Sequence, residues 1–139
     1  MSASHDDYEI SGDKSRLDID VIWGFLSTAY WSPGVERDVV ERSIEGSTVF
    51  GLYEPNGAQA GFARLVTDGA TFAWLADLFV LEEHRGKGLG VRLAEAAVAE
   101  AERLGLRATM LATKDAHTMY ERFGFEPLPP GRYMRRSGD

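Results

Sequence analysis

The chain has 139 residues, 44% of them hydrophobic, which is enough for one folded domain with a single core. Its formal net charge of −7 excludes a general nucleic-acid binder, because such proteins usually carry a basic face. The sequence has no cysteine, which excludes disulfides, thiolate metal sites and a cysteine nucleophile.

Composition also bears on location and on domain organisation. No apolar run approaches the length of a membrane span, and the N-terminus carries acids where a secretory signal has basic and apolar segments. We therefore expect a cytoplasmic protein with no membrane partner. Residues 1–6 are expected to be disordered within a single domain over 1–139, since no repeat or long linker divides the chain.

The N-terminal third predicts a short strand at 8–11 followed by two helices. The first helix starts at Asp18, and its apolar residues recur on one face: Ile19, Ile22, Phe25 and Leu26. The second helix covers 36–47 and ends near Gly46. Its residues expected to face inward are Val39, Val40 and Ile44.

Three consecutive strands are predicted next, at 48–53, 58–67 and 70–81. Asn56-Gly57 and Asp68-Gly69 are hairpin turn sequences, so these strands are expected to be antiparallel. The third strand is almost wholly apolar, which predicts burial on both of its faces.

The C-terminal half predicts a long helix that begins straight after residue 90 and runs to Leu104, a strand parallel to its predecessor, a short helix ending at Gly124, and closing strands at 125–128 and 132–136. Gly105 is expected to end the long helix in the left-handed conformation. The fold class is therefore α/β: one mixed, mostly antiparallel, twisted sheet flanked by helices.

The segment RGKGLG, residues 85–90, joins the third long strand to the long helix. Glycines let backbone N–H groups converge on one concavity, and a helix N-terminus adds free N–H groups and partial positive charge. The segment therefore suits a phosphate group, although a tight turn alone would also need glycine. Neither the nucleotide P-loop nor the dinucleotide pattern G-x-G-x-x-G fits its spacing.

The pattern that does fit is R-x-x-G-x-G, carried by Arg85, Gly88 and Gly90 between a strand and a helix. In this it resembles the acyl-CoA signature of the GNAT superfamily of N-acetyltransferases. The segment AHTMYERFGF, residues 116–125, also resembles that family's A-x-x-x-Y-x-x-x-G-F motif. The resemblance covers about residues 60–128 and implies the acyl-CoA N-acyltransferase fold.

The resemblance also implies how acetyl-CoA, the co-substrate, is held. Backbone N–H groups of the glycine segment would bind its pyrophosphate, with Arg85 and Lys87 adding positive field. The residues concerned are Arg85, Gly86, Lys87, Gly88, Leu89 and Gly90. The strand before them, at Leu78, Phe79 and Val80, would offer backbone hydrogen bonds to the pantetheine arm, like an added strand.

The catalytic residues that we expect are Tyr120 and Asp77. By similarity Tyr120 is the general acid for the departing thiolate; the alternative is a core aromatic. Some family members carry a glutamate where this chain has Ala76, so a direct carboxylate base there is in doubt. Asp77 is the one charged residue in an apolar strand: it either polarises a water or holds the substrate ammonium, or it satisfies backbone N–H groups at a bulge.

The acceptor site is expected between the first two helices. Tyr30 and Trp31 are large aromatics beside a proline turn, and they either wall a substrate pocket or cap the core. Glu36 and Arg64 are weaker candidates for the same pocket. No metal is expected.

The resemblance implies an N-acetyltransferase that moves acetyl from acetyl-CoA to a primary amine by direct attack in a ternary complex. The amine belongs to a small molecule or a protein. The alternatives are a catalytically silent acyl-CoA sensor of the same fold, and a binding module unrelated to CoA. The closing strands could pair across a homodimer.

Overall fold

The computed structural model describes residues 4–138. One five-stranded sheet runs in the order β1-β2-β3-β4-β5, antiparallel except for the last pair. The strands are β1 (Glu9–Ser11), β2 (Thr48–Tyr53), β3 (Gln59–Thr67), β4 (Phe72–Val80) and β5 (Ala108–Met110). The α-helices are α1 (Ile19–Leu26), α2 (Arg37–Glu45), α3 (Leu89–Leu104) and α4 (His117–Glu121). Single 3-10 turns lie at His5–Asp7, Lys14–Arg16 and Glu82–His84. The predicted fold class is confirmed.

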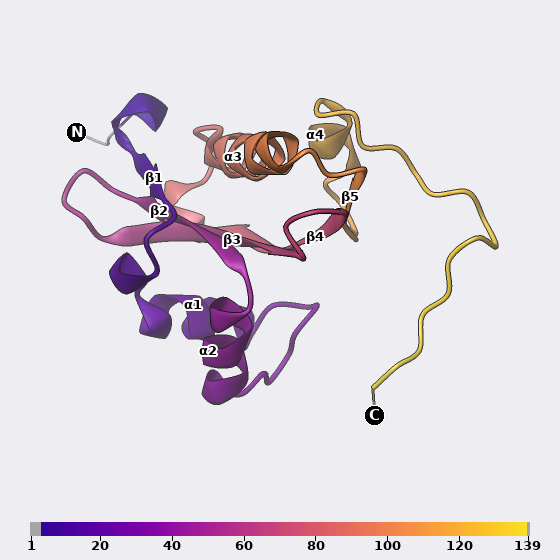
Figure 1. The fold of residues 1–139 in the computed structure, drawn as a ribbon. Helices are drawn as coiled ribbons and strands as arrows, with labels where there is room; N and C mark the ends of the chain where they lie inside the picture. Colours follow the sequence, from indigo (N-terminus) through magenta and orange to yellow (C-terminus); the bar gives the residue numbers. More distant parts are fainter. Residues whose placement is uncertain (1–3, 139) are drawn as a thin grey trace.

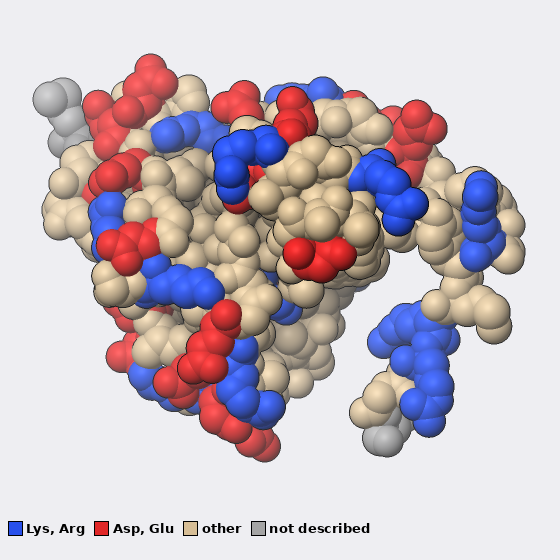
Figure 2. Space-filling model, viewed as in Figure 1, with Lys and Arg blue, Asp and Glu red and all other residues tan. Residues whose placement is uncertain are grey.

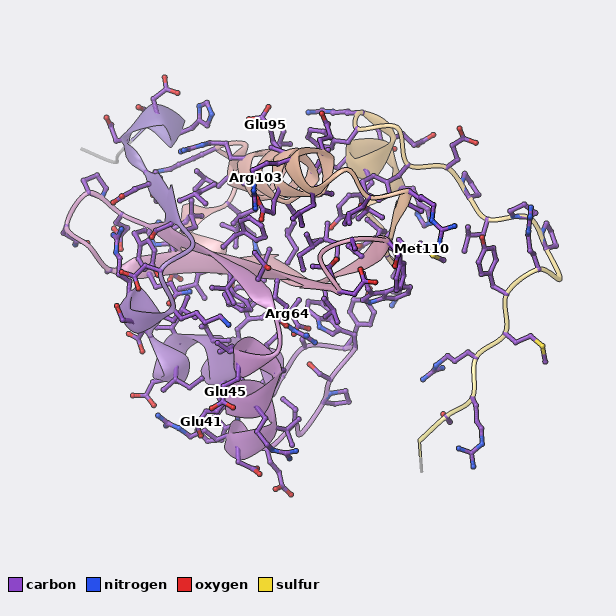
Figure 3. All side chains as sticks on the ribbon, viewed as in Figure 1. Glu41, Glu45, Arg64, Glu95, Arg103 and Met110 are labelled. Carbon is purple, nitrogen blue, oxygen red and sulfur yellow. The ribbon has the colours of Figure 1, made fainter. Side chains whose placement is uncertain are left out.

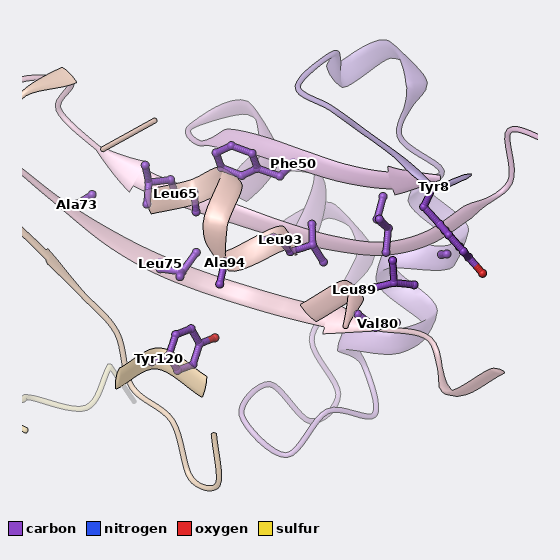
Figure 4. Close-up of a cluster of buried hydrophobic side chains, with 14 residues drawn as sticks. Tyr8, Phe50, Leu65, Ala73, Leu75, Val80, Leu89, Leu93, Ala94 and Tyr120 are labelled. Carbon is purple, nitrogen blue, oxygen red and sulfur yellow. The ribbon is translucent and has the colours of Figure 1, made fainter. Parts of the chain in front are cut away.

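Helices cover both faces of this sheet, and each face has its own core (Figure 1). α3 and α4 lie over one face, where Leu65, Leu75 and Leu93 belong to the larger buried cluster (Figure 4). α1 and α2 lie under the other face, where Phe62 and Phe79 pack with α1 and α2. Since both faces are covered near β2 and the first half of β3, nearly all residues there are buried.

Two predicted helix ends, the start of α1 and the end of α3, are confirmed by their caps, whereas α1 ends at Leu26 although the sequence predicts a helix as far as Tyr30. The Asp18 carboxylate accepts from the backbone N–H groups of Asp20 and Val21, which fixes the start of α1. Gly105 ends α3 with φ 69°, in the left-handed region. One inward residue was wrong: Val39 is 41% exposed, because α2 turns Val40 and Ile44 toward the sheet and leaves Val39 at its side.

β4 is not buried on both faces as its composition predicts. Phe72 and Trp74 are 44% and 38% exposed, while Ala73 and Leu75, which alternate with them, are buried under α3. The register with β3 then slips, because Phe62 pairs with Phe79 but Arg64 pairs with Ala76. This β-bulge inserts one residue into β4 and reverses which side chains face α3. Before the bulge the odd-numbered residues of β4 face α3, and after it the even-numbered residues do. Because both halves are apolar, the sequence shows them as one continuous apolar run.

The closing strands expected at 125–128 and 132–136 are absent. Every described residue from 126 onward is exposed and lacks strand pairing. The segment contains three prolines that cannot donate ladder hydrogen bonds, and it leaves the body as an extended chain (Figure 1). β5 consequently has a partner on one side only.

Residues 1–6 are predicted to be disordered, and the first three of them lie outside the described residues. From Ser4 the chain has a defined course, and the carbonyl of His5 accepts a hydrogen bond from Arg92 Nη1 at 2.7 Å. Within 4–138, no helix has both the length and the apolar content to cross a membrane.

Candidate acyl-CoA and acceptor site

β4 and β5 diverge, and the opening between them forms the centre of the site. Their pairing is limited to three residues of β4, Phe72, Ala73 and Trp74, although β4 continues to Val80. The second half of β4 therefore has a backbone edge that β5 does not use. An extended ligand arm can bind such an edge by hydrogen bonds of the sheet type.

The glycine segment lies where this free edge ends. Gly86 and Gly88 have φ of 84° and 76°, a region that other residues adopt only with strain, and Gly88 is the N-cap of α3. A Cβ at either position would meet no atom within 4 Å, so the space above the loop is open. Open space thus lies beside the loop at the N-terminus of a 16-residue helix, where backbone N–H groups without helical partners are found.

The two cations of this segment are partly engaged by the protein. Arg85 donates from Nε to the carbonyl of Val80 at 3.0 Å, which braces the loop against the end of β4. Lys87 lies 5.4 Å from the ring centroid of Tyr8 and 3.4 Å from its hydroxyl. Tyr8 in turn contacts His84 Nδ1 at 2.7 Å. These contacts position the loop, and the exposed Arg85 side chain still contributes positive field to it.

Tyr120 projects from α4 into the gap between β4 and β5. Its side chain is 8% exposed, lies edge-on to Phe125, and borders both hollows described below (Figure 4). Burial, with a smaller contribution from Tyr30, raises the pKa of the phenol to about 12. The hydroxyl is therefore protonated throughout the neutral range and can act as a hydrogen-bond donor.

Asp77 is the residue that the β4 bulge inserts. It has φ 56°, the only non-glycine positive φ among residues 4–138, and the bulge turns its side chain toward α1 and α2. Its carboxylate accepts from Arg64 Nε at 2.6 Å and from Trp31 Nε1 at 2.8 Å. Arg64 also donates from Nη1 to Ser47 Oγ at 3.1 Å, beneath the sheet (Figure 3). Both carboxylate oxygens are thus engaged by protein donors.

Tyr30 and Trp31 wall a hollow of about 930 Å³ on the α1–α2 side of the sheet. Tyr30 packs edge-on against Trp31, with ring centroids 5.1 Å apart, and both side chains are substantially exposed. Trp74 and Val39 add apolar surface, and Tyr120 and Asp77 lie on the same lining. The hollow therefore brings the two predicted catalytic residues together with the two predicted acceptor residues.

Several other side chains lie in positions that the sequence did not predict. Glu36 occupies the N-cap position of α2 without a side-chain capping hydrogen bond and is not on this lining, whereas Arg64 is. Trp74 is a lining residue that sequence reasoning missed. Its signal was the alternation of Phe72, Ala73, Trp74 and Leu75, which the continuous apolar run concealed. His117 borders the other hollow, beside β5.

Comparison with models of protein families identifies the family to which the chain belongs. The model of the acetyltransferase (GNAT) family matches residues 18–125, which include both helices under the sheet, the glycine loop and Tyr120. The chain is a member of the GNAT acetyltransferase family. The match also confirms the resemblance carried by the two short motifs, and it extends it back to α1.

Similar GNAT proteins agree with this assignment. An uncharacterized N-acetyltransferase of Escherichia coli, YjgM, is 32% identical over 126 residues, covering 88% of this chain and 70% of that protein. The Gibberella zeae protein FG08082 is 34% identical over 103 residues, covering 60% of this chain. This chain spans 58% of the length of that relative.

Solved structures share the fold. A GNAT-family protein from Xanthomonas campestris pv. campestris is 42% identical, with a TM-score of 0.88 over 94% of this chain and 92% of that one. The glucosamine-6-phosphate N-acetyltransferase of Arabidopsis thaliana has a TM-score of 0.71 at 17% identity, covering 95% of this chain and 99% of that one. At that identity the likeness concerns the fold alone.

Proposed function

We propose that this GNAT protein transfers an acetyl group from acetyl-CoA to a primary amine by direct attack in a ternary complex. The observation that carries the proposal is the continuity of three features: the free edge of β4, the open glycine loop at the start of α3, and the Tyr120 phenol in the gap between the strands. Pyrophosphate, pantetheine and thioester would lie along them in that order. The N–H groups of residues 86–90 would bind the diphosphate, and the edge at 76–80 the arm.

The reaction forms a C–N bond and breaks the thioester C–S bond. The amine nitrogen attacks the acetyl carbon, the tetrahedral oxyanion is stabilised by backbone N–H donors, and the sulfur leaves as a thiolate. The nitrogen loses its surplus proton to water as the amide forms, and the thiolate takes up a proton from water, so that free CoA thiol is the second product. A phenol with a pKa of about 12 is a weaker acid than an alkyl thiol, whose pKa is about 8.5. Tyr120 therefore acts chiefly by donating a hydrogen bond to the sulfur as negative charge develops there.

We assign Asp77 to positioning. Both of its oxygens accept hydrogen bonds from Arg64 and Trp31, so the carboxylate holds the acceptor wall in place instead of abstracting a proton. No carboxylate stands at Ala76 either. The amine therefore loses its proton to water in the open hollow before it attacks, because an alkylammonium with a pKa of about 10 must be neutral to act as a nucleophile.

The acceptor side favours an amine carried on an apolar or aromatic body. Tyr30, Trp31 and Trp74 are 57%, 42% and 38% exposed, which leaves three aromatic faces available around one hollow. Arg64, a partly buried cation on this lining, is already paired with Asp77, and the other two cations there, Lys114 and Arg135, are exposed. The lining also carries one exposed acid, Asp115, so aromatic contact supplies the larger part, and a single carboxylate the smaller part, of what the hollow offers to an amine.

The experiment that tests the proposal is thiol release from acetyl-CoA with a panel of primary amines. Arylalkylamines such as phenethylamine and tyramine should be acetylated, and polyamines such as spermidine should react more slowly. Initial-velocity lines should intersect, as direct transfer requires. Acetyl-CoA binding without turnover for any amine would indicate the silent sensor, and no binding by calorimetry would reject the CoA site altogether.

A further inference from the structure

Primary amines are rare among the side chains of this protein. All but three of its 15 cationic residues are arginines, and the exceptions are Lys14, Lys87 and Lys114. The basic side chains of residues 132–136, which stand clear of the body in Figure 2, are also all arginine. An arginine guanidinium stays protonated in proteins and is therefore not an acceptor for an acetyl group.

One of the three lysines lies on the acceptor hollow. Lys114 belongs to the same lining as Tyr30 and Tyr120. Neither Lys14 nor Lys87 borders this hollow or the second one, of about 970 Å³, beside β5. A primary amine of the protein itself therefore shares the space in which the substrate amine is proposed to react.

The backbone of Lys114 is anchored to the wall of that hollow. Residues 111–116 connect β5 to α4 beyond the point where β5 has diverged from β4. The Ala116 N–H donates to Thr113 Oγ at 3.1 Å, which fixes the turn within this connection. The Lys114 N–H donates to the Tyr30 hydroxyl at 3.2 Å, which joins the connection to the loop after α1.

The side chain of Lys114 follows the same wall. Its Nζ lies 5.3 Å from the centroid of the Tyr30 ring, a cation–π contact that holds the amine over the aromatic face. The side chain is nevertheless exposed, so its ammonium remains in contact with water. Lys114 is thus held near the acceptor aromatics without being buried.

Tyr30 relates Lys114 to the place where the thioester is proposed to lie. Besides burial, Tyr30 contributes to the raised pKa of Tyr120, an electrostatic effect that weakens with distance. The Tyr30 phenol therefore lies near the Tyr120 hydroxyl that is proposed to face the CoA sulfur. Because the lysine side chain is long and flexible, rotation about its bonds carries Nζ from the Tyr30 ring toward the gap beside Tyr120.

We propose that Lys114 is a self-acetylation site, which takes the acetyl group from acetyl-CoA bound to the same chain when no other amine is present. This inference rests on the proposed acetyl transfer. The ammonium first gives a proton to water, and the neutral Nζ then attacks the acetyl carbon, so that a C–N bond forms and the C–S bond breaks. The nitrogen loses a further proton to water and the thiolate takes one up, which leaves Nε-acetylated Lys114 and free CoA.

Acetylation changes the hollow in two ways. It removes the positive charge and the cation–π contact of Lys114, and it adds an acetyl group to the space that an incoming amine uses. The product is an amide, which does not pass its acetyl group on, so the modified chain is not an intermediate of transfer to other amines. Self-acetylation therefore lowers the activity of the protein toward small amines.

Peptide mass spectrometry after incubation of the purified chain with acetyl-CoA alone tests the proposal. Lys14 is the internal control, because it is exposed and its Nζ donates to the Glu45 carbonyl, away from both hollows. Lys114 should be acetylated about a hundredfold faster than Lys14 or more, since a held acceptor reacts at a high effective concentration. Its rate constant should not depend on protein concentration, because donor and acceptor belong to one chain.

Two arginine variants complete the test. Preincubation with acetyl-CoA should lower the subsequent rate with phenethylamine in the native chain and in Lys14→Arg, but not in Lys114→Arg. Equal acetylation of Lys114 and Lys14 would indicate chemical modification alone, and a rate constant proportional to protein concentration would show that one copy modifies another; either result overturns the proposal. Turnover of small amines without acetylation of Lys114 overturns this inference and leaves the proposed function standing, whereas acetylation of neither overturns both.

Discussion

At the scale of single residues, removing the Tyr120 hydroxyl distinguishes a catalytic role of this residue from a purely structural one. Tyr120→Phe keeps the ring and its contact with Phe125, so unfolding free energy and acetyl-CoA affinity should change little. Turnover should fall by about 10²-fold or more, the usual effect of losing one donor or acid. Steady-state kinetics, calorimetry and denaturant unfolding on the same preparation measure the three quantities. A variant with full turnover would make Tyr120 a core aromatic.

Tyr53→Phe is the matched control. Tyr53 is also a buried tyrosine, and its hydroxyl has no hydrogen-bond partner among the described residues, so its loss should leave turnover unchanged.

The dependence of stability on pH provides a second test of the Tyr120 phenol. The folded pKa of Tyr120, about 12, lies above the unfolded value of 10, so the folded state loses stability as pH rises from 10 to 12. Tyr120→Phe should remove part of that loss.

Asp77 combines a strained backbone with two hydrogen bonds, and three substitutions separate the two effects. Asp77→Asn should cost roughly 1–3 kcal/mol, because asparagine tolerates positive φ but leaves Arg64 without a charged partner. Asp77→Ala should be less stable than Asp77→Gly by about 1–2 kcal/mol, since only glycine adopts φ 56° without strain. Chemical denaturation measures all three.

The same asparagine variant tests the positioning role through pH dependence. If Asp77 only holds Trp31 and Arg64, Asp77→Asn should raise KM for the amine and keep the shape of the kcat/KM profile with pH. Loss of the acidic limb of that profile would instead make Asp77 the general base.

At the scale of elements, the two ends of α3 offer a test of the glycine loop with an internal control. Gly88 and Gly105 both have positive φ, 76° and 69°, and a Cβ at either would meet nothing within 4 Å. Asp at either position should therefore cost similar backbone strain, about 1–2 kcal/mol. Only Gly88→Asp places a carboxylate at the helix N-terminus where the diphosphate is proposed to bind.

We expect Gly88→Asp to lower acetyl-CoA affinity at least a hundredfold, and Gly105→Asp to leave it within a few-fold of the native value. Isothermal calorimetry measures both. At a ligand concentration of ~100 Kd, acetyl-CoA should stabilise the native protein and Gly105→Asp by about 2.7 kcal/mol, and Gly88→Asp by much less. Equal affinity in the two variants would exclude the glycine loop as the phosphate site.

At the scale of the whole molecule, the two cores should not depend on the C-terminal segment. A chain ended after Gly131 keeps every residue of both buried clusters and loses, among those described, only residues that are exposed, so its free energy of unfolding should stay within about 0.5 kcal/mol of the native value. Arg135, which lies on the lining of the acceptor hollow, is among the residues removed, so the KM for the amine is the quantity that we expect to change. Denaturant unfolding and steady-state kinetics of both chains measure the two effects, and a large loss of stability would show that the segment packs on the body.

Local chemistry, which needs no tertiary context, determined most of the fold and the backbone conformation of the glycine loop. The Asp18 cap, the Asn-Gly and Asp-Gly turns and the helix-ending Gly105 act within a few residues, so their outcomes followed from the sequence. The conformation of the glycine loop could likewise be predicted from the sequence, because positive φ and open backbone N–H groups require glycine at fixed positions.

The tertiary structure alone decided three matters, each of which depends on residues distant in sequence. Slippage between β3 and β4 placed Asp77 on the acceptor side, and an apolar run conceals a change of alternation. The Arg64 and Trp31 bonds to Asp77 join three elements, so no local pattern predicts them. Residues 132–136 have strand composition but no strand pairing, because composition sets only the tendency to pair, while the three prolines between residues 127 and 130 lead the segment away from the sheet (Figure 1).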